Sequence, residues 1–386
     1  MTMEDTEIEK DLSASEVVEK YKAAAELANS VMLELLEFIQ PGQNVVDVCT
    51  HGDRLIMEGS AKKFLKLKTN KGIAWPTCIS VNNCAGHFSP LPDDPAVILK
   101  EGDVVKIDLG VHFDGYISQC AHTIVLGHNP ETPITGKVAD AICAAYFIGE
   151  CVQRLLRPGK TNNEITQIIQ KICETFHVSP VEGVLSHEVS RNIIDGNNVI
   201  LQKPAVDQTV EEFKFEINKA YVIDIVISTG EGKTREVDKA TRVFKRALDR
   251  NYQLKLQTSR AVFSEITQKS PFLPFTMRML DEKKRKMAIT EMMKHDMLDA
   301  YPVLFEKEGS TIVQFKFTVL MLANFTTRLN NFNLPLVTSE FSIDGVPEVQ
   351  AILALSMKRK KKSNKKKKGK ANPNAMEVEG EEEDEE

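Results

Sequence analysis

The sequence lacks the features that mark several protein classes. Among 386 residues there are only seven Cys, widely spaced and without a CxxC pair. We therefore expect reduced thiols and no disulfide framework or structural zinc site. No apolar run reaches the ~18 residues of a membrane-spanning helix, and the first residues, MTMEDTEIEK, are acidic, unlike a signal peptide. These absences predict no membrane insertion and a place on the cytosolic or nuclear side of the membrane.

The composition is that of a folded chain with charged ends. Hydrophobic residues make up 42% and charged residues 27%, which excludes wholesale disorder and a fibrous chain. The net charge is −6, but the charges are unevenly distributed along the chain. Residues 358–370 hold ten positive charges, and residues 377–386 hold eight negative ones. Such charge blocks bury nothing. We expect residues 1–12 and 346–386 to be disordered and residues 13–345 to form the folded domain.

The folded part contains a pattern that occurs twice. Two amphipathic helices separated by Pro-Gly precede a strand that carries an aspartate, Asp108 in the first copy and Asp224 in the second. This order favours an internal duplication and an α/β fold with a pseudo-twofold axis; chance similarity of two helix–turn–helix signals is the alternative. The expected segments are helices 16–39 and 44–66, hairpin 103–127, helices 136–156 and 162–177, and strand 220–232.

The second copy is interrupted. Residues 241–260 contain six basic residues and one acidic one, and residues 281–295 have the pattern of a helix with a basic first half. Strand character returns at 312–321. We therefore interpret residues 241–303 as an insertion into the main domain.

Four side chains are candidates for a site. Asp108 and Asp224 occupy equivalent strands, so in a duplicated fold they converge on the pseudo-twofold axis, where His87 or His187 would complete a site for divalent cations. Each residue also has an ordinary interpretation: an aspartate at a strand end accepts backbone hydrogen bonds, and His187 is a satisfied core histidine.

Several motifs resemble a known family. SVNNCAGH, KIDLG, EGVLSH, AYVID and VQFKFT resemble the type 2 methionine aminopeptidases, which have the pita-bread fold. ILKEGDVVKIDLGVH, STGEGK, QTSRAVFSE and FEKEGS resemble its proliferation-associated, ErbB-receptor-binding branch, whose members are held to be non-catalytic. The resemblance covers about residues 15–335 and implies the duplicated pita-bread architecture with a type 2 insertion at 241–303.

The resemblance also locates a metal site that has lost its ligands. Enzymes of the family hold two metals with Asp, Asp, His, Glu and Glu, and the corresponding positions here are Asp108, Gln119, His187, Asp224 and Lys316. His87 corresponds to a substrate-facing histidine. At ~4 Å and an effective dielectric of ~20, a lysine ammonium repels one dication by roughly 8 kcal/mol. We therefore expect no metal cofactor, no aminopeptidase activity and a salt bridge from Lys316 to an aspartate. The alternative is an active metal-dependent methionine aminopeptidase.

Two basic regions are candidate contacts for RNA phosphates. In the insertion, Phe244 and Tyr252 are interleaved and offer stacking surfaces, although a charged helix face is often only solvated. The basic block 358–370 also resembles a nuclear or nucleolar import signal. The alternative interpretation of this block is a solvated tail that only increases solubility. The insertion candidates are Arg242, Lys245, Arg246, Arg250, Lys255, Arg260, Lys283, Lys284, Arg285 and Lys286. Those of the tail are Lys358, Arg359, Lys360, Lys361, Lys362, Lys365, Lys366, Lys367, Lys368 and Lys370.

The resemblance implies a binding function. Members of this branch bind ribosomal and other structured RNA, associate with the large ribosomal subunit near the nascent-chain tunnel exit, and move between cytoplasm and nucleolus. They act in translation, ribosome biogenesis and growth control. We expect a monomeric pseudoenzyme of this kind. The further alternative is a protein–protein adaptor in growth signalling or transcriptional repression.

Overall fold

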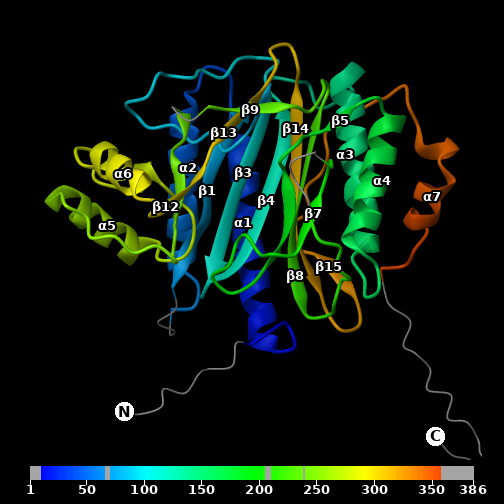
Figure 1. Cartoon of the computed structure of the whole chain (residues 1–386). Coiled ribbons are helices and arrows are strands. Elements are labelled where there is room, and N and C mark those ends of the chain that lie inside the picture. The colour runs from blue at the N-terminus through cyan, green and yellow to red at the C-terminus, as the bar shows by residue number, and fades with distance from the viewer. Residues whose placement is uncertain (1–9, 66–69, 205–209, 238–239, 358–386) are drawn as a thin grey trace, which may run out of the picture.

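A computed structural model describes residues 10–65, 70–204, 210–237 and 240–357. An antiparallel sheet of nine strands forms its centre, with the order β1-β3-β4-β14-β8-β6-β7 and with β15 beside β14 and β5 beside β8. Its strands are β1 (Lys71–Val81), β3 (Val104–Phe113), β4 (Tyr116–Val125), β5 (Ser179–Pro180), β6 (Leu185–Val189), β7 (Val199–Leu201), β8 (Lys219–Ser228), β14 (Ile312–Met321) and β15 (Thr326–Arg328). Figure 1 shows the central strands side by side.

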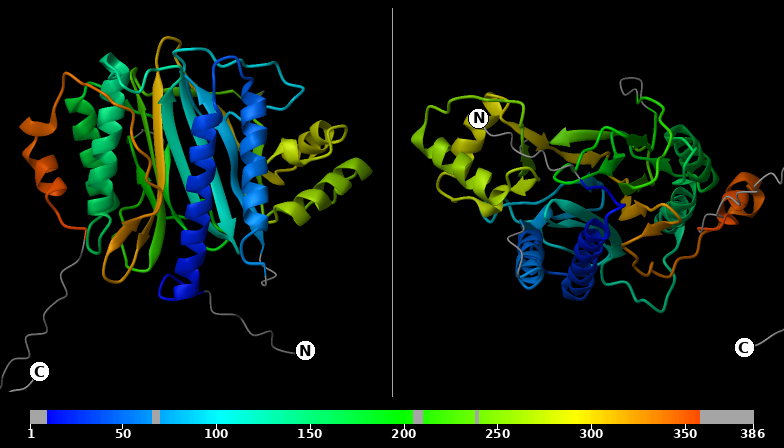
Figure 2. Two further views of the ribbon diagram at one scale, coloured as in Figure 1. Left: turned by 180° about the vertical axis from the view of Figure 1, so that it is seen from behind. Right: turned by 90° about the horizontal axis from the view of Figure 1, so that it is seen from below.

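Two pairs of helices cover the back of this sheet, as the rear view in Figure 2 shows. Helices α1 (Ser15–Phe38) and α2 (Val45–Ala61) pack on β1, β3 and β4, while α3 (Gly136–Leu155) and α4 (Asn162–Thr175) pack on the half that contains β8. Each pair shares its own apolar core with its strands. The predicted repeat of two helices and an aspartate-bearing strand is therefore present in the structure.

The predicted hairpin is formed by β3 and β4, which are antiparallel and paired from Val104–Val125 to Phe113–Tyr116. Asp114 and Gly115 make the turn, and both have positive φ angles of 56° and 79°. A two-residue turn with positive φ at both positions matches the right-handed twist of the strands, which explains the Asp-Gly sequence at this point.

The insertion is a small unit with a core of its own. It contains β10 (Val243–Arg246), α5 (Gln257–Lys269), β11 (Phe275–Thr276), the 3-10 turn η2 (Met277–Met279), α6 (Arg285–Lys294) and β12 (Leu298–Tyr301). Its three strands form a sheet in the order β11-β10-β12, and α5 and α6 pack together over apolar residues that include Phe244 and Met292. Figure 1 shows these helices projecting beside α2.

A second small sheet joins the two halves in front of the large sheet. It consists of β2 (Cys84–Gly86), β13 (Val303–Glu306) and β9 (Thr234–Val237), in that order.

Among the described residues no helix is long and apolar enough to cross a membrane.

The domain boundaries predicted from sequence are wrong at both ends. Leu12 is buried against the main domain, although residues 1–12 were expected to be disordered. Helix α7 (Pro347–Leu353), which follows the 3-10 turn η3 (Ile343–Gly345), packs on α3 through the buried Val349, although residues 346–386 were assigned to a tail. The charge blocks 358–370 and 377–386 lie outside the described residues.

Candidate functional site

Three neighbouring strands bring the predicted site residues together. Lys316 of β14 is opposite Asp224 of β8 on one side and Ala121 of β4 on the other, and Ala121 is opposite Asp108 of β3. In paired strands, residues that stand opposite each other project to the same face of the sheet. The register therefore places Asp108, Lys316 and Asp224 in one row across the centre of the sheet.

Lys316 binds both aspartates. Its Nζ lies 2.7 Å from Asp108 Oδ2 and 2.9 Å from Asp224 Oδ2. The exposed fraction of the side chain is 6% for Lys316, 3% for Asp108 and 12% for Asp224. The same ammonium lies 5.5 Å from the centre of the Trp75 ring, close enough for a cation–π contact. The predicted salt bridge of Lys316 is thus present, with both candidate partners at once.

The electrostatics of this group favour a charged lysine. Burial by itself would lower the pKa of Lys316, but the carboxylates of Asp108 and Asp224 outweigh it and raise that pKa above its usual value. Burial raises the pKa of Asp108, and the Lys316 ammonium opposes this rise without cancelling it. Among the described residues, Asp108 Oδ1 has no hydrogen-bond partner. The cluster holds a protonated lysine between two buried carboxyl groups.

Gln314 completes the cluster, and the sequence analysis missed its role. Its Nε2 donates to Asp224 Oδ1 at 2.8 Å. Because it lies two residues before Lys316 in β14, its side chain is on the same face of the sheet. The alternation in VQFKFT is the sequence signal from which this contact can be found.

The remaining predicted residues line the same cavity without joining the ion pairs. Gln119 is buried, and its backbone N–H donates to Thr318 Oγ1 at 2.9 Å. In the described residues His187 Nδ1 is buried without a hydrogen-bond partner, and burial lowers the pKa of His187. His87 Nδ1 is 3.0 Å from the Pro302 carbonyl oxygen, and burial, followed by the charge of Lys316, lowers the pKa of His87 to about 4. Both histidines are therefore neutral near pH 7.

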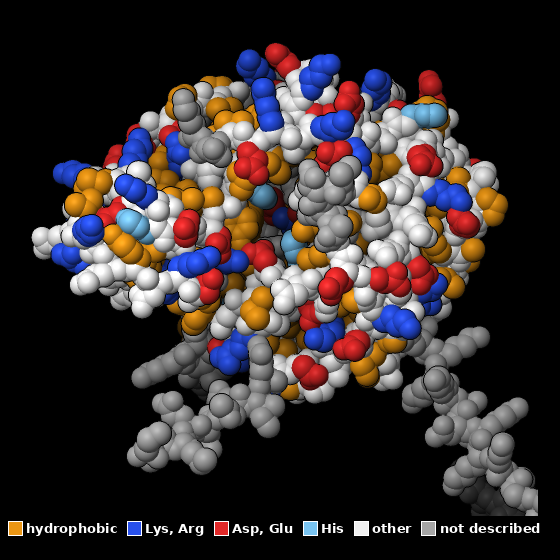
Figure 3. Space-filling view, viewed as in Figure 1, with side chains coloured by type: hydrophobic (Ala, Val, Ile, Leu, Met, Phe, Trp, Pro, Cys, Tyr) orange, Lys and Arg blue, Asp and Glu red, His pale blue; other side chains and the backbone are white. Residues whose placement is uncertain are grey.

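These residues surround a cavity of about 200 Å³, which Figure 3 shows as a hollow near the centre of the molecular face. At its rim the insertion meets the β6–β7 loop, where the Tyr301 hydroxyl and Lys245 Nζ each lie 2.6 Å from Asp195 Oδ2. Trp75 and Tyr301 are in edge contact, with ring centroids 4.8 Å apart. The cavity is thus a narrow pocket whose lining includes the ammonium group of Lys316.

The donor set does not suit two metal ions. The metal-bridging carboxylates of the family are replaced here by a neutral amide at Gln119 and by an ammonium at Lys316, which already occupies an oxygen of each remaining aspartate. In the described part of the chain no group of three or more His, Cys, Asp or Glu side chains is arranged to hold a metal ion. A divalent cation would have to displace Lys316 from both carboxylates.

The insertion residues predicted to contact RNA divide into two groups. Arg285 is buried and 2.5 Å from Asp93, Arg242 is 2.7 Å from Asp94, and Lys245 is bound to Asp195. Arg246 lies over the Phe263 ring at 4.9 Å. The cationic groups of these four residues hold the insertion together or fix it to the main domain, and their role as RNA contacts stays a prediction. The exposed candidates are Arg250, Lys255, Arg260, Lys283, Lys284 and Lys286.

The aromatic residues proposed as stacking surfaces are corrected. Phe244 lies in the core of the insertion, so it cannot stack on a base. Tyr252 stacks on His295, with ring centroids 3.6 Å apart, and only its outer face remains available. The tail candidates, from Lys358 to Lys370, lie outside the described residues.

Fold and site together define a pita-bread domain with a lysine at the position of a metal ligand. The profile of metallopeptidase family M24 matches residues 19–224. Proliferation-associated protein A of Dictyostelium discoideum is 48% identical over 336 residues, covering 86% of this chain and 87% of that protein. ERBB-3 binding protein 1 of Solanum tuberosum is 45% identical over 355 residues, covering 91% of each.

A solved structure, that of a thermophilic Arx1, has a TM-score of 0.84 and 26% identity, covering 90% of this chain and 100% of the other. The chain belongs to metallopeptidase family M24 and, within it, to the proliferation-associated branch of methionine-aminopeptidase-like proteins.

Proposed function

We propose that this protein is a non-catalytic member of its family that binds structured RNA and the large ribosomal subunit near the tunnel exit. In this proposal it acts as a monomer in translation, ribosome biogenesis and growth control, in the cytoplasm and the nucleolus. The observation that carries the non-catalytic part is the double ion pair of Lys316 with Asp108 and Asp224. Without metals there is no activated water to attack a peptide bond.

The RNA-binding part is supported by charge. Six exposed cations lie on the insertion, and the tail adds ten positive charges within residues 358–370. Figure 3 shows Lys and Arg side chains distributed over the insertion at the left of the view. Phosphate contacts of this kind give affinity that falls with salt and carries little base preference.

Metal analysis and an activity assay test the first part. The purified, tag-free protein should contain almost no divalent metal and should not cleave a Met-Gly-Ser peptide with added cobalt or manganese. Two tightly held metals with turnover would overturn the proposal in favour of an active methionine aminopeptidase. The variant Gln119→Asp/Asp224→Glu/Lys316→Glu restores the ligand set of the family, so it should gain metal binding that the native chain lacks.

Ribosome sedimentation tests the second part. The full chain should pellet with large ribosomal subunits at low salt and be released as salt rises. Persistence at high salt, or no binding at all, would contradict phosphate-driven recognition.

The second candidate is a protein–protein adaptor in growth signalling or transcriptional repression. It is favoured by the name ERBB-3 binding protein of the Solanum relative. A pull-down with the cytoplasmic part of an ErbB receptor, performed after nuclease treatment, distinguishes direct protein contact from contact through RNA.

A further inference from the structure

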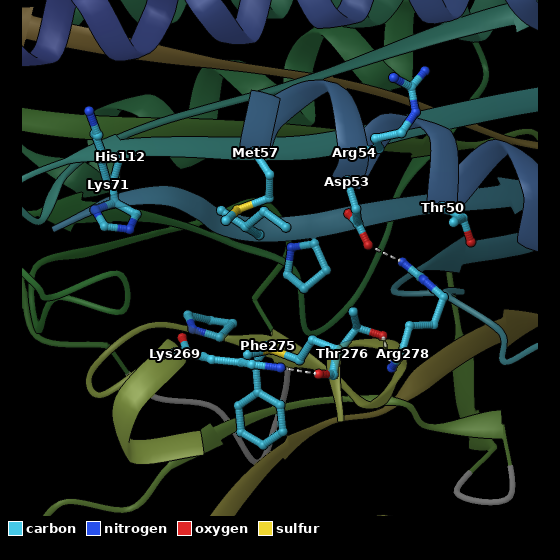
Figure 4. A pocket seen from close by; sticks show the side chains of 15 residues that line it. Thr50, Asp53, Arg54, Met57, Lys71, His112, Lys269, Phe275, Thr276 and Arg278 are labelled. Atoms are coloured by element: carbon cyan, nitrogen blue, oxygen red, sulfur yellow. Dashed lines mark hydrogen bonds and ion pairs between the residues drawn. The ribbon is translucent and has the colours of Figure 1, made fainter. Parts of the chain in front are cut away.

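A second groove lies between the main domain and the insertion. Its volume is about 490 Å³, and it shares no lining residue with the Lys316 pocket. Figure 4 shows its two walls facing each other, with Thr50, Asp53 and Met57 on one side and Lys269, Phe275 and Arg278 on the other. A cavity of this size is in the range that takes a small ligand or a few peptide residues.

Apolar side chains form most of the groove surface. Met57 of α2 is 51% exposed, and it lines the groove together with Met279 of the insertion. Ile73 of β1 also lines the groove. Flexible methionine side chains adapt to different apolar side chains, so this surface suits a hydrophobic anchor.

The charged groups around this apolar surface are mainly positive. The groove is lined by four cationic side chains and a single carboxylate, Asp53, which Arg278 already binds at 2.6 Å. Arg54 and Lys269 are about half exposed, and each is paired with a carboxylate one helical turn away. Arg54 also contacts His51 Nδ1 at 3.0 Å, and Lys269 Nζ donates to the Met279 carbonyl oxygen at 2.7 Å. Exposed pairs of this type contribute about 0–1 kcal/mol, so an incoming carboxylate can exchange with them. Charge complementarity therefore favours an acidic occupant over a basic one.

The outer edge of β1 borders this groove. Asp53 Oδ1 accepts the Thr77 N–H at 2.8 Å, and Arg278 Nη2 donates to the Thr77 carbonyl oxygen at 3.3 Å. β1 is the end strand of the large sheet. At Thr77, Asp53 and Arg278 bind the backbone N–H and carbonyl groups that a further strand would otherwise pair. Residues 71–76 continue this edge along the groove. An extended peptide can bind to such an edge through its main chain.

We propose that this groove binds an extended acidic–apolar segment of a partner protein. Its apolar side chain would insert between Met57 and Met279, and neighbouring carboxylates would bind Arg54, Lys71 and Lys269. The proposal does not rest on RNA binding or on the absence of catalysis.

Fluorescence polarisation of the full chain tests the proposal. The probe is a fluorescein-labelled peptide in which Leu alternates with Glu, an arrangement that places Leu on one face of an extended chain. We expect saturable binding that weakens with salt. A peptide with Ser in place of Leu and one with Lys in place of Glu should both fail to bind. Equal binding of either control peptide would overturn the proposal.

Matched substitutions locate the site. Met57→Glu should weaken binding about tenfold or more, because burial of a methionine side chain is lost. Met287→Glu is the control, since Met287 is 50% exposed on α6 and outside the groove. Lys269→Glu should weaken binding, while Lys284→Glu should not; both lysines are nearly half exposed and paired with an acid on or beside their own helix. Unfolding curves of the variants should match that of the native chain.

Other occupants are distinguishable. If laurate binds at Met57 and the peptide does not, the groove is a site for small amphipathic anions and the proposal is wrong. Peptide binding that occurs only after removal of residues 371–386 would identify the chain's own acidic end as the occupant, and would likewise overturn the proposal.

Discussion

At the scale of single residues, Lys316 determines the character of the site. A buried ion pair contributes little net stability, but the loss of one partner leaves uncompensated charge in the interior. The buried carboxylates of Asp108 and Asp224 are both paired with the ammonium group of Lys316. Lys316 is therefore needed for stability as long as both aspartates are present.

Lys316→Met should lower the free energy of unfolding by about 3–5 kcal/mol, the cost of breaking a buried pair. Urea unfolding at pH 7 measures this loss. The triple variant Lys316→Met/Asp108→Asn/Asp224→Asn removes the orphaned charges and should recover most of it. A triple variant no more stable than the single one would show that packing, and not charge, is the cause.

Lys106 gives a pH dependence. It is fully buried, its Nζ donates to the Asn82 carbonyl oxygen at 2.7 Å, and burial lowers its pKa from 10.5 to about 7. Between these two pKa values the unfolded chain binds a proton that the folded chain does not, so the free energy of unfolding rises with pH.

Relative to Lys106→Met, the native chain should gain about 2 kcal/mol of stability between pH 7 and pH 9. Comparison with the variant cancels the titration of all other groups. Parallel stability curves for the two proteins over this range would mean that Lys106 remains charged in the folded state.

At the scale of elements, β14 connects the two halves of the duplicated fold. It pairs with β8 along its whole length and meets β4 at Lys316. The two half-sites are thus joined where the ion pairs form. Helix α7 extends the second half at the surface by packing on α3.

Val349 tests whether α7 belongs to the folded domain. It is fully buried in the core of the second half, so Val349→Ala should cost roughly 1–3 kcal/mol. Leu355→Ala, at a side chain that is 37% exposed, is the matched control and should cost less than about 1 kcal/mol. Equal effects, measured by urea unfolding, would show that α7 does not contribute to stability.

At the scale of the whole molecule, the exposed cations proposed as RNA contacts are distinct from the charged groups that line the Lys316 pocket. The Lys316 site is enclosed, whereas the exposed cations of the insertion and the basic block 358–370 are the proposed RNA contacts. The affinity of such a surface depends on the number of phosphates neutralised, and each contact changes the salt slope by nearly one unit.

Replacement of Lys360, Lys361 and Lys362 by Gln should therefore reduce the slope of log K against log salt by about 2–3 units. Lys255→Gln/Lys283→Gln/Lys284→Gln should have a similar effect if the insertion also contacts phosphates. Titration of fluorescent ribosomal RNA fragments at several salt concentrations measures both. Lys22→Gln/Lys137→Gln, at exposed lysines of the main domain, is the control and should leave the slope unchanged.

The sequence by itself determined most of the fold. Helical periodicity, the Pro-Gly stops and the Asp-Gly turn are local signals, so the helices, the hairpin and the duplication could be recognised without coordinates. Family motifs then identified the five site positions and predicted that Lys316 pairs with an aspartate. Formal charge alone was sufficient for that step, because an ammonium and two carboxylates in one pocket must pair.

Only the tertiary structure decided which partners each charged group has. Arg242, Arg285 and Phe244 are of residue types that also make exposed contacts, but packing of the insertion buries Arg285 and Phe244 and pairs Arg242 with Asp94. Both effects depend on neighbours that are distant in sequence. The double ion pair of Lys316, the hydrogen bond from Gln314 to Asp224 and the groove beside Met57 likewise arise from strand register and from the docking of the insertion. Composition and spacing along the chain do not encode these distances; the three-dimensional packing does.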